Sequence, residues 1–127
     1  MQKYAFRFEQ LTVYQRSLAL SIRVYTLSQK WPREHLFGIT DQLRRAILSI
    51  PLNIAEGYSR TRKDFQHFLM ISRGSCFECI PLIQLAKQMK LLTLDEATSL
   101  YNELLEISLM LSGLRSSLRS QVLSSKL

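Results

Sequence analysis

The stretch 38–60 carries apolar residues at helical spacing and therefore predicts a helix with one buried face. The apolar positions are Leu43, Ile47, Ile50 and Ile54. A polar stripe of the same spacing runs beside them and consists of Gln42, Arg45, Ser49, Asn53, Glu56 and Arg60. An ordinary solvated face would carry interchangeable Lys and Glu, so this mixture favours a specified hydrogen-bonded network, although a simple solvated face also fits the pattern.

Pro51 lies inside this predicted helix. Because proline has no N–H group, the carbonyl of Ile47 must find another donor or a water. The helix could break in two at this point, but the apolar positions keep their phase on both sides of the proline, which favours a kinked, continuous helix. At its start, Thr40 is expected to cap the helix with its hydroxyl, and Asp41 to interact with the positive end of the helix dipole.

The stretch 12–30 predicts another helix, which Pro32 ends. It has two adjoining apolar seams, so we expect it to contact two neighbours. One seam is Leu11, Tyr14, Leu18, Ile22 and Tyr25, and the other is Val13, Leu20, Val24, Leu27 and Trp31. Residues 1–10 alternate between apolar and polar, which predicts an extended arm laid on the helices.

A third helix is expected from Thr61 to about residue 90, with a main seam of Phe65, Leu69, Cys76, Ile80 and Ile83. Ser75 and Glu78 interrupt the apolar stripe beside that seam. A buried carboxylate needs a partner, so we expect Glu78 to pair with Arg45. The complete predicted network is Arg45, Ser49, Asn53, Glu56, Ser75 and Glu78.

The last helix begins with a capping box formed by Thr93 and Glu96. Its seam follows a strict 3-4 alternation through Ala97, Leu100, Leu104, Ile107, Leu111, Leu114 and Leu118. Four such helices joined by short connectors predict an all-α fold, an antiparallel up-down-up-down four-helix bundle. We expect residues 1–127 to form one domain, with 1–10 as the arm and 120–127 as a frayed tail.

The central helix also carries a family resemblance. The run Gln42-Leu43-Arg44-Arg45-Ala46, then Ser49-Ile50-Pro51, then Asn53-Ile54-Ala55-Glu56-Gly57 resembles the signature of the four-helix-bundle 23S rRNA intervening sequence proteins. The resemblance implies a homo-oligomeric ring, commonly a pentamer. It also extends to the accessory proteins of diversity-generating retroelements, which implies nucleic acid and a reverse transcriptase as partners.

Candidate chemistry is sparse. Cys76 and Cys79 could form a redox pair or half of a zinc site, but they fall inside a helix with no strand before it, which favours core thiols. His35 and His67 are expected on the surface, where they would not complete a familiar zinc site. Glu56 and Glu78 could be a carboxylate pair for acid-base or metal chemistry, but pairing with arginine is favoured because the Glu-x-x-His repeats of bundle metal sites are missing. We therefore expect no enzyme activity, no catalytic residue, no metal and no cofactor.

The net charge of +7 in 127 residues raises the expectation of a polyanionic partner, although many soluble proteins are merely basic. In the predicted topology, one end collects most of this charge. The basic residues there are Lys3, Arg7, Arg60, Arg62, Lys63, Arg115, Arg119 and Lys126, against Glu9, Glu56 and Asp64. The opposite end is closer to balanced.

Two hypotheses follow from this charge. The first is a protein that binds the phosphate backbone of RNA or DNA, with structured RNA favoured, through Arg60, Arg62 and Lys63 and then Arg115 and Arg119. Tyr58 could stack on a base, but a buried anchor of the turn is the stronger interpretation. The second is a protein-interaction scaffold or reverse-transcriptase accessory factor with no direct sequence readout. The chain has no membrane-length apolar run and no signal peptide at its start, so we expect a cytoplasmic protein.

Overall fold

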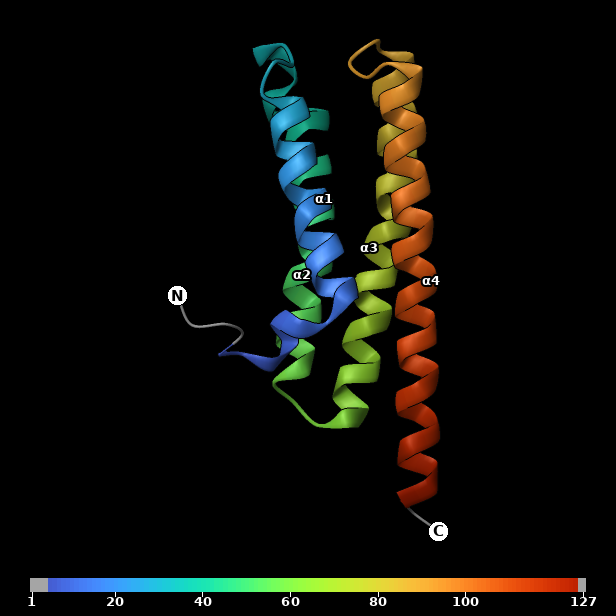
Figure 1. Ribbon diagram of the computed structural model, residues 1–127. Coiled ribbons are helices and arrows are strands. Elements are labelled where there is room, and N and C mark those ends of the chain that lie inside the picture. Colours follow the sequence, from blue (N-terminus) through green and yellow to red (C-terminus); the bar gives the residue numbers. More distant parts are fainter. Residues whose placement is uncertain (1–4, 126–127) are drawn as a thin grey trace.

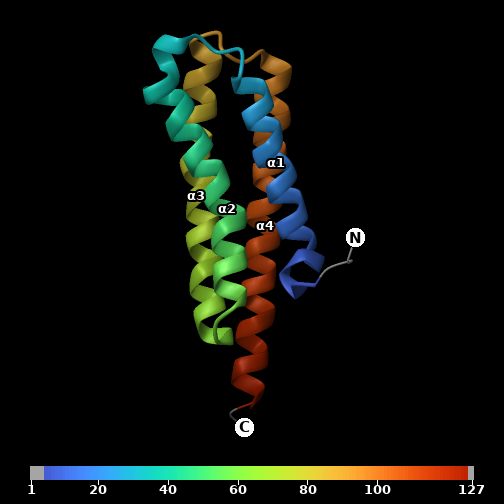
Figure 2. The same cartoon turned by 90° about the vertical axis from the view of Figure 1, so that its left-hand side faces the viewer.

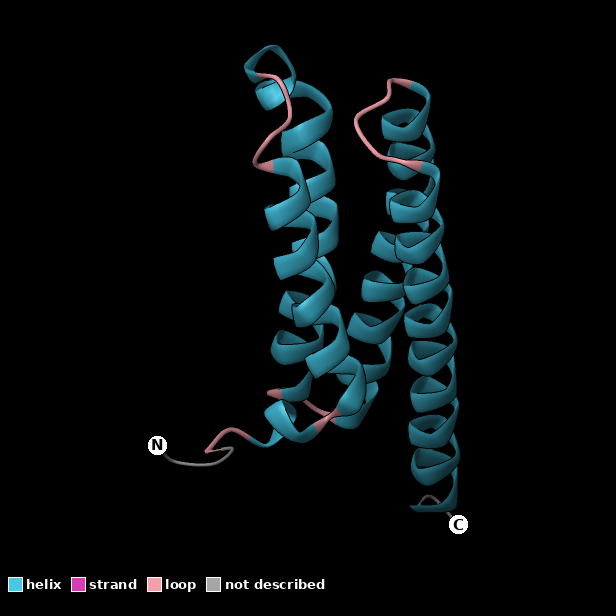
Figure 3. Cartoon of the chain, turned by 45° about the horizontal axis from the view of Figure 1, so that its top comes forward, coloured by secondary structure: helices cyan, strands magenta, loops and turns pink. Residues whose placement is uncertain are grey.

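The computed structural model describes residues 5–125 and forms a four-helix bundle (Figure 1). The helices are α1 (Thr12–Ser28), α2 (Asp41–Tyr58), α3 (Arg62–Gln88) and α4 (Leu94–Ser125). Short helical turns flank them: η1 (Arg7–Gln10), η2 (Arg33–His35) and η3 (Leu36–Thr40). Consecutive helices run in opposite directions, and short loops join them (Figures 2 and 3).

The predicted seam of α2 forms the centre of the core. Leu43, Ile47, Ile50 and Ile54 are at most 1% exposed. α2 packs against α1 on one side and α3 on the other, and α3 packs against α4, whereas α1 and α4 form the weakest of the four contacts between neighbouring helices. The predicted seam of α4 is also buried from Ala97 to Leu111.

Pro51 does not break α2, so the prediction of a continuous helix is confirmed. The expected replacement donor for the Ile47 carbonyl comes from α1. The hydroxyl of Ser21 lies 3.3 Å from the Ile47 carbonyl oxygen, and 2.9 Å from the carbonyl oxygen of Ser17, one turn earlier in α1. On the other side of α2, Ser72 of α3 donates to the carbonyl of Ile50 at 3.0 Å. Buried serines from two helices therefore bind the α2 backbone where the proline interrupts it.

Gly57 marks the closest approach of α2 to α3. It is buried inside α2, and a Cβ atom added there would overlap the Cβ of Phe68 and lie 3.1 Å from the ring of Phe65. Gly57 lies one residue before the end of α2 at Tyr58. The glycine is required by the packing of two helices rather than by the turn.

The start of α2 differs from expectation. Thr40 has helical dihedrals (φ −61°, ψ −53°), and its buried hydroxyl has no hydrogen-bond partner in the described part of the chain. An N-cap residue needs an extended backbone, whereas here the π-helical turn Leu36–Thr40 feeds directly into α2. The predicted Thr40 cap is therefore wrong, and the Asp41 N–H is satisfied by carbonyls of the turn instead.

α1 contacts two neighbours, α2 and, less closely, α4, as predicted, but one of its two apolar seams is largely exposed. The seam with Val13, Leu20 and Val24 is buried, but Leu18, Ile22 and Tyr25 are 36%, 60% and 38% exposed. The face of α1 that packs against α2 buries serines instead, namely Ser17, Ser21 and Ser28. One apolar side of α1 is consequently left at the surface.

The amino-terminal arm is not extended from Arg7 onward, because Arg7–Gln10 forms the 3₁₀ turn η1. Glu9 closes this turn by accepting a hydrogen bond from the Phe6 N–H at 3.0 Å. Phe8 packs edge-on against Tyr14, with ring centroids 4.9 Å apart, and fixes the turn on α1. Lys3 and Lys126, which were expected at the basic end, lie outside the described residues.

α3 is long and apolar enough to resemble a membrane-spanning helix by length and composition alone. Its predicted main seam instead forms part of the bundle core, with Phe65, Leu69, Cys76 and Ile83 buried. α3 starts directly after Thr61, as predicted, and Thr61 caps it: the Asp64 N–H donates to Thr61 Oγ1 at 3.1 Å. It ends just before Lys90, which takes a left-handed φ of 62°.

The predicted capping box of α4 is confirmed. The Glu96 N–H donates to Thr93 Oγ1 at 3.0 Å, and the Thr93 N–H donates to Glu96 Oε1 at 2.9 Å. This backbone hydrogen bond lowers the pKa of Glu96, and Lys30 acts in the same direction. At the other end, α4 remains helical to Ser125, past the predicted start of the tail at residue 120.

Gly57→Ala should destabilise the fold by about 1–3 kcal/mol, because the new methyl group overpacks the α2–α3 contact. Gly74→Ala is the matched control, since an added Cβ at that exposed site in α3 meets nothing within 4 Å. Alanine should raise stability there by up to about 1 kcal/mol. Urea unfolding followed by circular dichroism measures both changes, and equal effects would contradict the assigned role of Gly57.

Glu96→Ala should lower stability at pH 7 by about 0.3–1.5 kcal/mol, because the capping box is lost. The folded state lowers the pKa of Glu96 below 4.5, so its contribution is complete above that value and disappears as the pH falls through the folded-state pKa. The gap between wild type and variant should therefore shrink towards pH 3. Glu34→Ala, at an exposed carboxylate in η2, serves as control; a gap independent of pH would refute the assignment.

Candidate nucleic-acid interface

The structure brings together the three segments that were expected to form a basic end. The start of α1, the α2–α3 turn and the end of α4 lie at the same end of the bundle, and α4 extends beyond the turn (Figures 1 and 2). The described basic residues there are Arg7, Arg60, Arg62, Lys63, Arg115 and Arg119, against Glu9, Glu56 and Asp64. This end therefore carries six basic residues against three acidic ones, even without Lys3 and Lys126.

The Arg60 side chain already has partners within the protein. Its guanidinium forms an i,i+4 ion pair with Glu56 at 2.6 Å, and it lies over the Phe68 ring, 5.1 Å from the centroid. The hydrogen bond to Glu56 raises the pKa of Arg60. This pair neutralises part of the predicted site.

Arg62 and Lys63 remain available to a ligand. Both are exposed in the first turn of α3, and neither forms an ion pair among the residues described. The amino-terminal end of a helix also carries a positive partial charge, which adds to the field of the two side chains. Asp64 opposes them in the same turn, so the local excess is one positive charge plus the helix dipole.

Arg115 and Arg119 lie one turn apart on α4, where Arg115 is half-buried and Arg119 exposed. Neither forms an ion pair within the described range. They share an end of the bundle with Arg62 and Lys63 but belong to a different helix. The structure therefore offers two separate basic segments.

Tyr58 is 36% exposed and packs edge-on against Phe65, with ring centroids 5.4 Å apart. The T-shaped contact fixes the α2–α3 turn, which agrees with the predicted anchor. The ring is nevertheless less buried than expected.

The predicted polar network is only partly present. Ser49 and Ser75 are joined by a hydrogen bond between their hydroxyls at 2.5 Å, and Asn53 Nδ2 donates to the Ser49 carbonyl at 2.8 Å. The expected Glu78–Arg45 pair is wrong. Glu78 is exposed, and Arg45 instead pairs with Asp41 at 3.2 Å, one turn away on its own helix. Because Glu78 is not buried, it does not need an internal counter-charge.

Charges at the opposite end are more often engaged. Arg45 pairs with Asp41, Lys30 lies 4.0 Å from Glu96, and Arg44 donates to Ser28 Oγ at 2.8 Å. Arg44 also lies over the Tyr25 ring, 4.9 Å from the centroid. The two ends therefore differ in how far their basic residues are paired within the protein.

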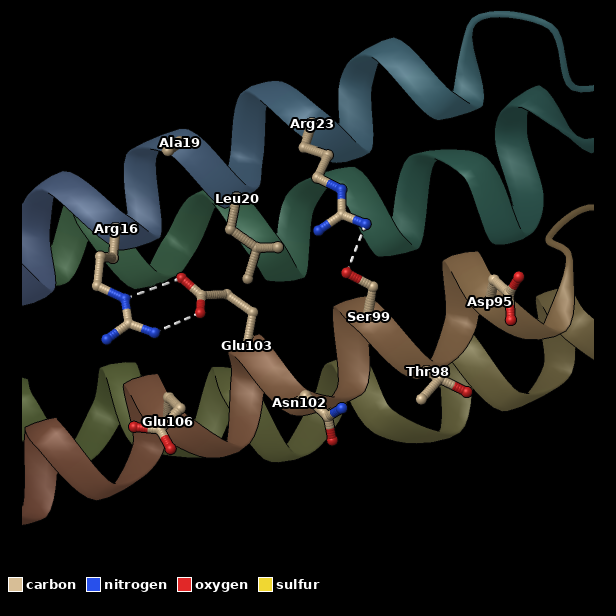
Figure 4. A pocket seen from close by; sticks show the side chains of 10 residues that line it. All are labelled: Arg16, Ala19, Leu20, Arg23, Asp95, Thr98, Ser99, Asn102, Glu103 and Glu106. Carbon is tan, nitrogen blue, oxygen red and sulfur yellow. Dashed lines mark hydrogen bonds and ion pairs between the residues drawn. The ribbon is translucent and has the colours of Figure 1, made fainter.

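Sequence analysis missed a charged groove of about 580 Å³ between α1 and α4 (Figure 4). Arg16 bridges it with a bidentate hydrogen bond to Glu103, at 3.0 and 2.5 Å, which raises the pKa of Arg16. Arg23 donates to Ser99 Oγ at 2.8 Å. Asp95 and Glu106 line the same groove, whose mixed signs do not favour a polyanion. Helical spacing predicts on which face of a helix a residue lies, but not which residue of another helix it meets.

The cysteines are core thiols, as predicted. Cys76 and Cys79 are 1% and 0% exposed and unbonded, and burial raises the pKa of Cys76 to about 12 and that of Cys79 further. Both are therefore neutral at physiological pH and poor metal ligands or nucleophiles. Within residues 5–125, His, Cys, Asp and Glu form no group of three suited to a metal ion. His67 is exposed and His35 half-buried.

Two comparisons with known proteins found matches that cover most of the chain. The sequence profile of the 23S rRNA-intervening sequence protein family matches residues 9–113. A solved structure, a protein of unknown function from the S23 ribosomal protein family of Bacteroides thetaiotaomicron, is 25% identical and superimposes with a TM-score of 0.75. That similarity covers 82% of this chain and 95% of the other. No curated protein matches the chain. The profile spans α1, α2, α3 and most of α4, and the chain therefore belongs to the 23S rRNA-intervening sequence protein family.

Proposed function

We propose that this protein is a non-enzymatic nucleic-acid-binding protein that contacts the phosphate backbone of structured RNA through its basic end. The observation that carries the proposal is the pair Arg62 and Lys63, exposed at the start of α3 and without ion pairs in the described chain. Such charges release condensed counterions when they approach phosphates, which supplies affinity without reading sequence.

The proposal ranks the contacts by their availability. Arg62 and Lys63 come first, because Arg60 must share its charge with Glu56. Arg115 and Arg119 form a second, flanking segment on α4. Backbone recognition suits this arrangement, since exposed arginine and lysine side chains at helix ends can contact phosphates without reading base edges.

The name of the matching family refers to sequences that intervene in 23S rRNA, which makes structured RNA the first ligand to test. A homo-oligomeric ring, as the resemblance implies, would repeat the basic end once per subunit. Repetition raises avidity by linking weak sites at high effective concentration. A modest charge on each subunit can therefore support useful affinity.

An interaction scaffold is the second candidate function, and one observation favours it. Large apolar side chains are exposed on all four helices, including Ile22, Leu52, Phe77 and Leu105, each at least 48% exposed. Exposed apolar patches mark protein contact sites. The two functions can coexist, since the apolar surfaces lie along the bundle and the basic cluster at its end.

The double variant Arg62→Glu with Lys63→Glu should weaken binding of a labelled structured RNA at least tenfold, because two phosphate contacts become repulsive. The slope of log affinity against log salt should fall in magnitude by about two, near one per lost contact. Fluorescence anisotropy at several salt concentrations measures both quantities, with duplex DNA compared alongside.

The matched control is Arg33→Glu with Lys87→Glu, which changes the net charge equally but at the opposite end of the bundle. It should retain most of the RNA affinity. Circular dichroism confirms that both variants fold. Absence of wild-type binding at low salt, or equal losses in both variants, rejects the basic end as the site and leaves the scaffold function.

A further inference from the structure

A pocket of about 600 Å³ lies between the segment before α1 and the end of α2. We call it the arm pocket. Its volume falls within the range of small-ligand sites, which is about 300–1,000 Å³. The side chains that matter for its chemistry are Phe6, Arg7 and Phe8 on one wall and Leu52, Glu56 and Tyr58 on the other.

Two aromatic side chains of the arm pocket keep much of their surface uncovered. Phe6 is 68% exposed and Tyr58 is 36% exposed. Phe6 packs against Phe8 with ring centroids 5.9 Å apart, and Tyr58 packs edge-on against Phe65. Each ring is therefore held by a neighbouring ring and still offers surface to a ligand.

Hydrogen bonds hold the segment that carries Phe6. The Phe6 N–H donates to Glu9 Oε1 at 3.0 Å, and Gln15 of α1 donates to the Glu9 carbonyl at 2.7 Å. η1 also contacts α2. The arm pocket is thus formed before a ligand arrives, which lowers the entropic cost of binding.

The arm pocket adjoins the basic end of the bundle. Its α2 wall continues to Ser59, directly before Arg60. Arg62 lies at most about 11 Å from Ser59, because three residues of chain span no more than ~3.6 Å each. Arg7 belongs to the wall itself and forms no ion pair with any described residue.

We propose that the arm pocket binds one unpaired nucleobase of an RNA strand whose phosphates contact the basic end. Every base has a π-face, so it stacks on exposed aromatic side chains without a strict sequence preference. Hairpin loops and bulges present such unstacked bases, whereas a fully paired RNA helix does not. Phe6 and Tyr58 supply the stacking surface, and Arg7 supplies a charge for the adjoining phosphate.

The charged wall residues favour a base over an apolar segment of a partner protein. An apolar partner would remove Arg7 and Glu56 from water without offering them hydrogen bonds. A base brings N–H groups on its edge, which a carboxylate accepts. Glu56 Oε1 accepts from Arg60, and the second carboxylate oxygen remains for such an edge.

This inference rests on the proposed RNA-binding function and adds that the RNA is recognised partly through an unpaired base. A hairpin RNA with 2-aminopurine in its loop tests it, with a fully paired RNA of equal length as reference. Binding of the full chain should change the 2-aminopurine fluorescence. Phe6→Ala should abolish this change and weaken hairpin binding about fivefold or more, because base stacking is lost.

The salt dependence separates this site from the phosphate contacts. Phe6→Ala should leave the slope of log affinity against log salt unchanged, since it removes no charge, and should bind paired RNA as wild type does. Phe6→Trp should restore hairpin binding. Phe37→Ala, at a side chain 92% exposed in η3 at the opposite end of the bundle, is the matched control and should behave as wild type.

Unchanged hairpin affinity in Phe6→Ala, or equal losses for hairpin and paired RNA, overturns the arm pocket and leaves the contacts of Arg62 and Lys63 intact. A change in protein mass on size-exclusion chromatography with unchanged RNA affinity assigns Phe6 to a protein contact and also overturns it.

A titration with adenosine monophosphate decides the arm pocket independently of RNA affinity. In ¹⁵N NMR spectra of the full chain, millimolar adenosine monophosphate should shift the amide signals of Leu52 and Tyr58, and ribose 5-phosphate, which lacks the base, should not. Equal shifts with both compounds, or none with either, overturn base binding. Shifts with adenosine monophosphate alone, in a protein that binds no RNA, would reject only the proposed RNA function.

Discussion

The close contact between α2 and its neighbours is the constraint on which the bundle depends. Small residues make that contact possible: Gly57 admits the side chain of Phe68, and Ser21 and Ser72 bring hydroxyls against the α2 backbone beside Pro51. Each serine hydroxyl also binds a buried carbonyl, so close packing and hydrogen-bond satisfaction are achieved by the same residues. The proline is tolerated in the core because these donors surround it.

This solution has a consequence for the surface. α1 uses serines to approach α2, and its larger residues Leu18, Ile22 and Tyr25 are left outside. α3 and α4 likewise leave Phe77 and Leu105 exposed beside their shared groove. A chain of this size usually covers such residues unless another molecule does so. The packing of the interior thus determines which sides of the bundle are available for association.

Electrostatics distinguishes the two ends by pairing. At the α1–α2 connection, Arg44 donates a hydrogen bond to Ser28 of α1, and Arg45 pairs with Asp41 one turn earlier in α2. At the α2–α3 turn, Arg60 has a partner but Arg62 and Lys63 do not, in the part of the chain described. Exposed ion pairs contribute little to stability, so this asymmetry bears on ligand attraction more than on folding.

Local and periodic features could be predicted from the sequence because they depend on near neighbours. They include the four helices, the buried seam around Ile47 and Ile50, the continuous helix through Pro51, and the capping box of Thr93 and Glu96. The Glu78–Arg45 pair, the Thr40 cap and the buried second face of α1 were wrong, and the Arg16–Glu103 groove was missed. Each of these depends on the rotation and height of one helix against another. Helical spacing gives the face on which a residue lies, but only tertiary packing decides which helix that face meets, because the contacts that set rotation join residues far apart in the chain.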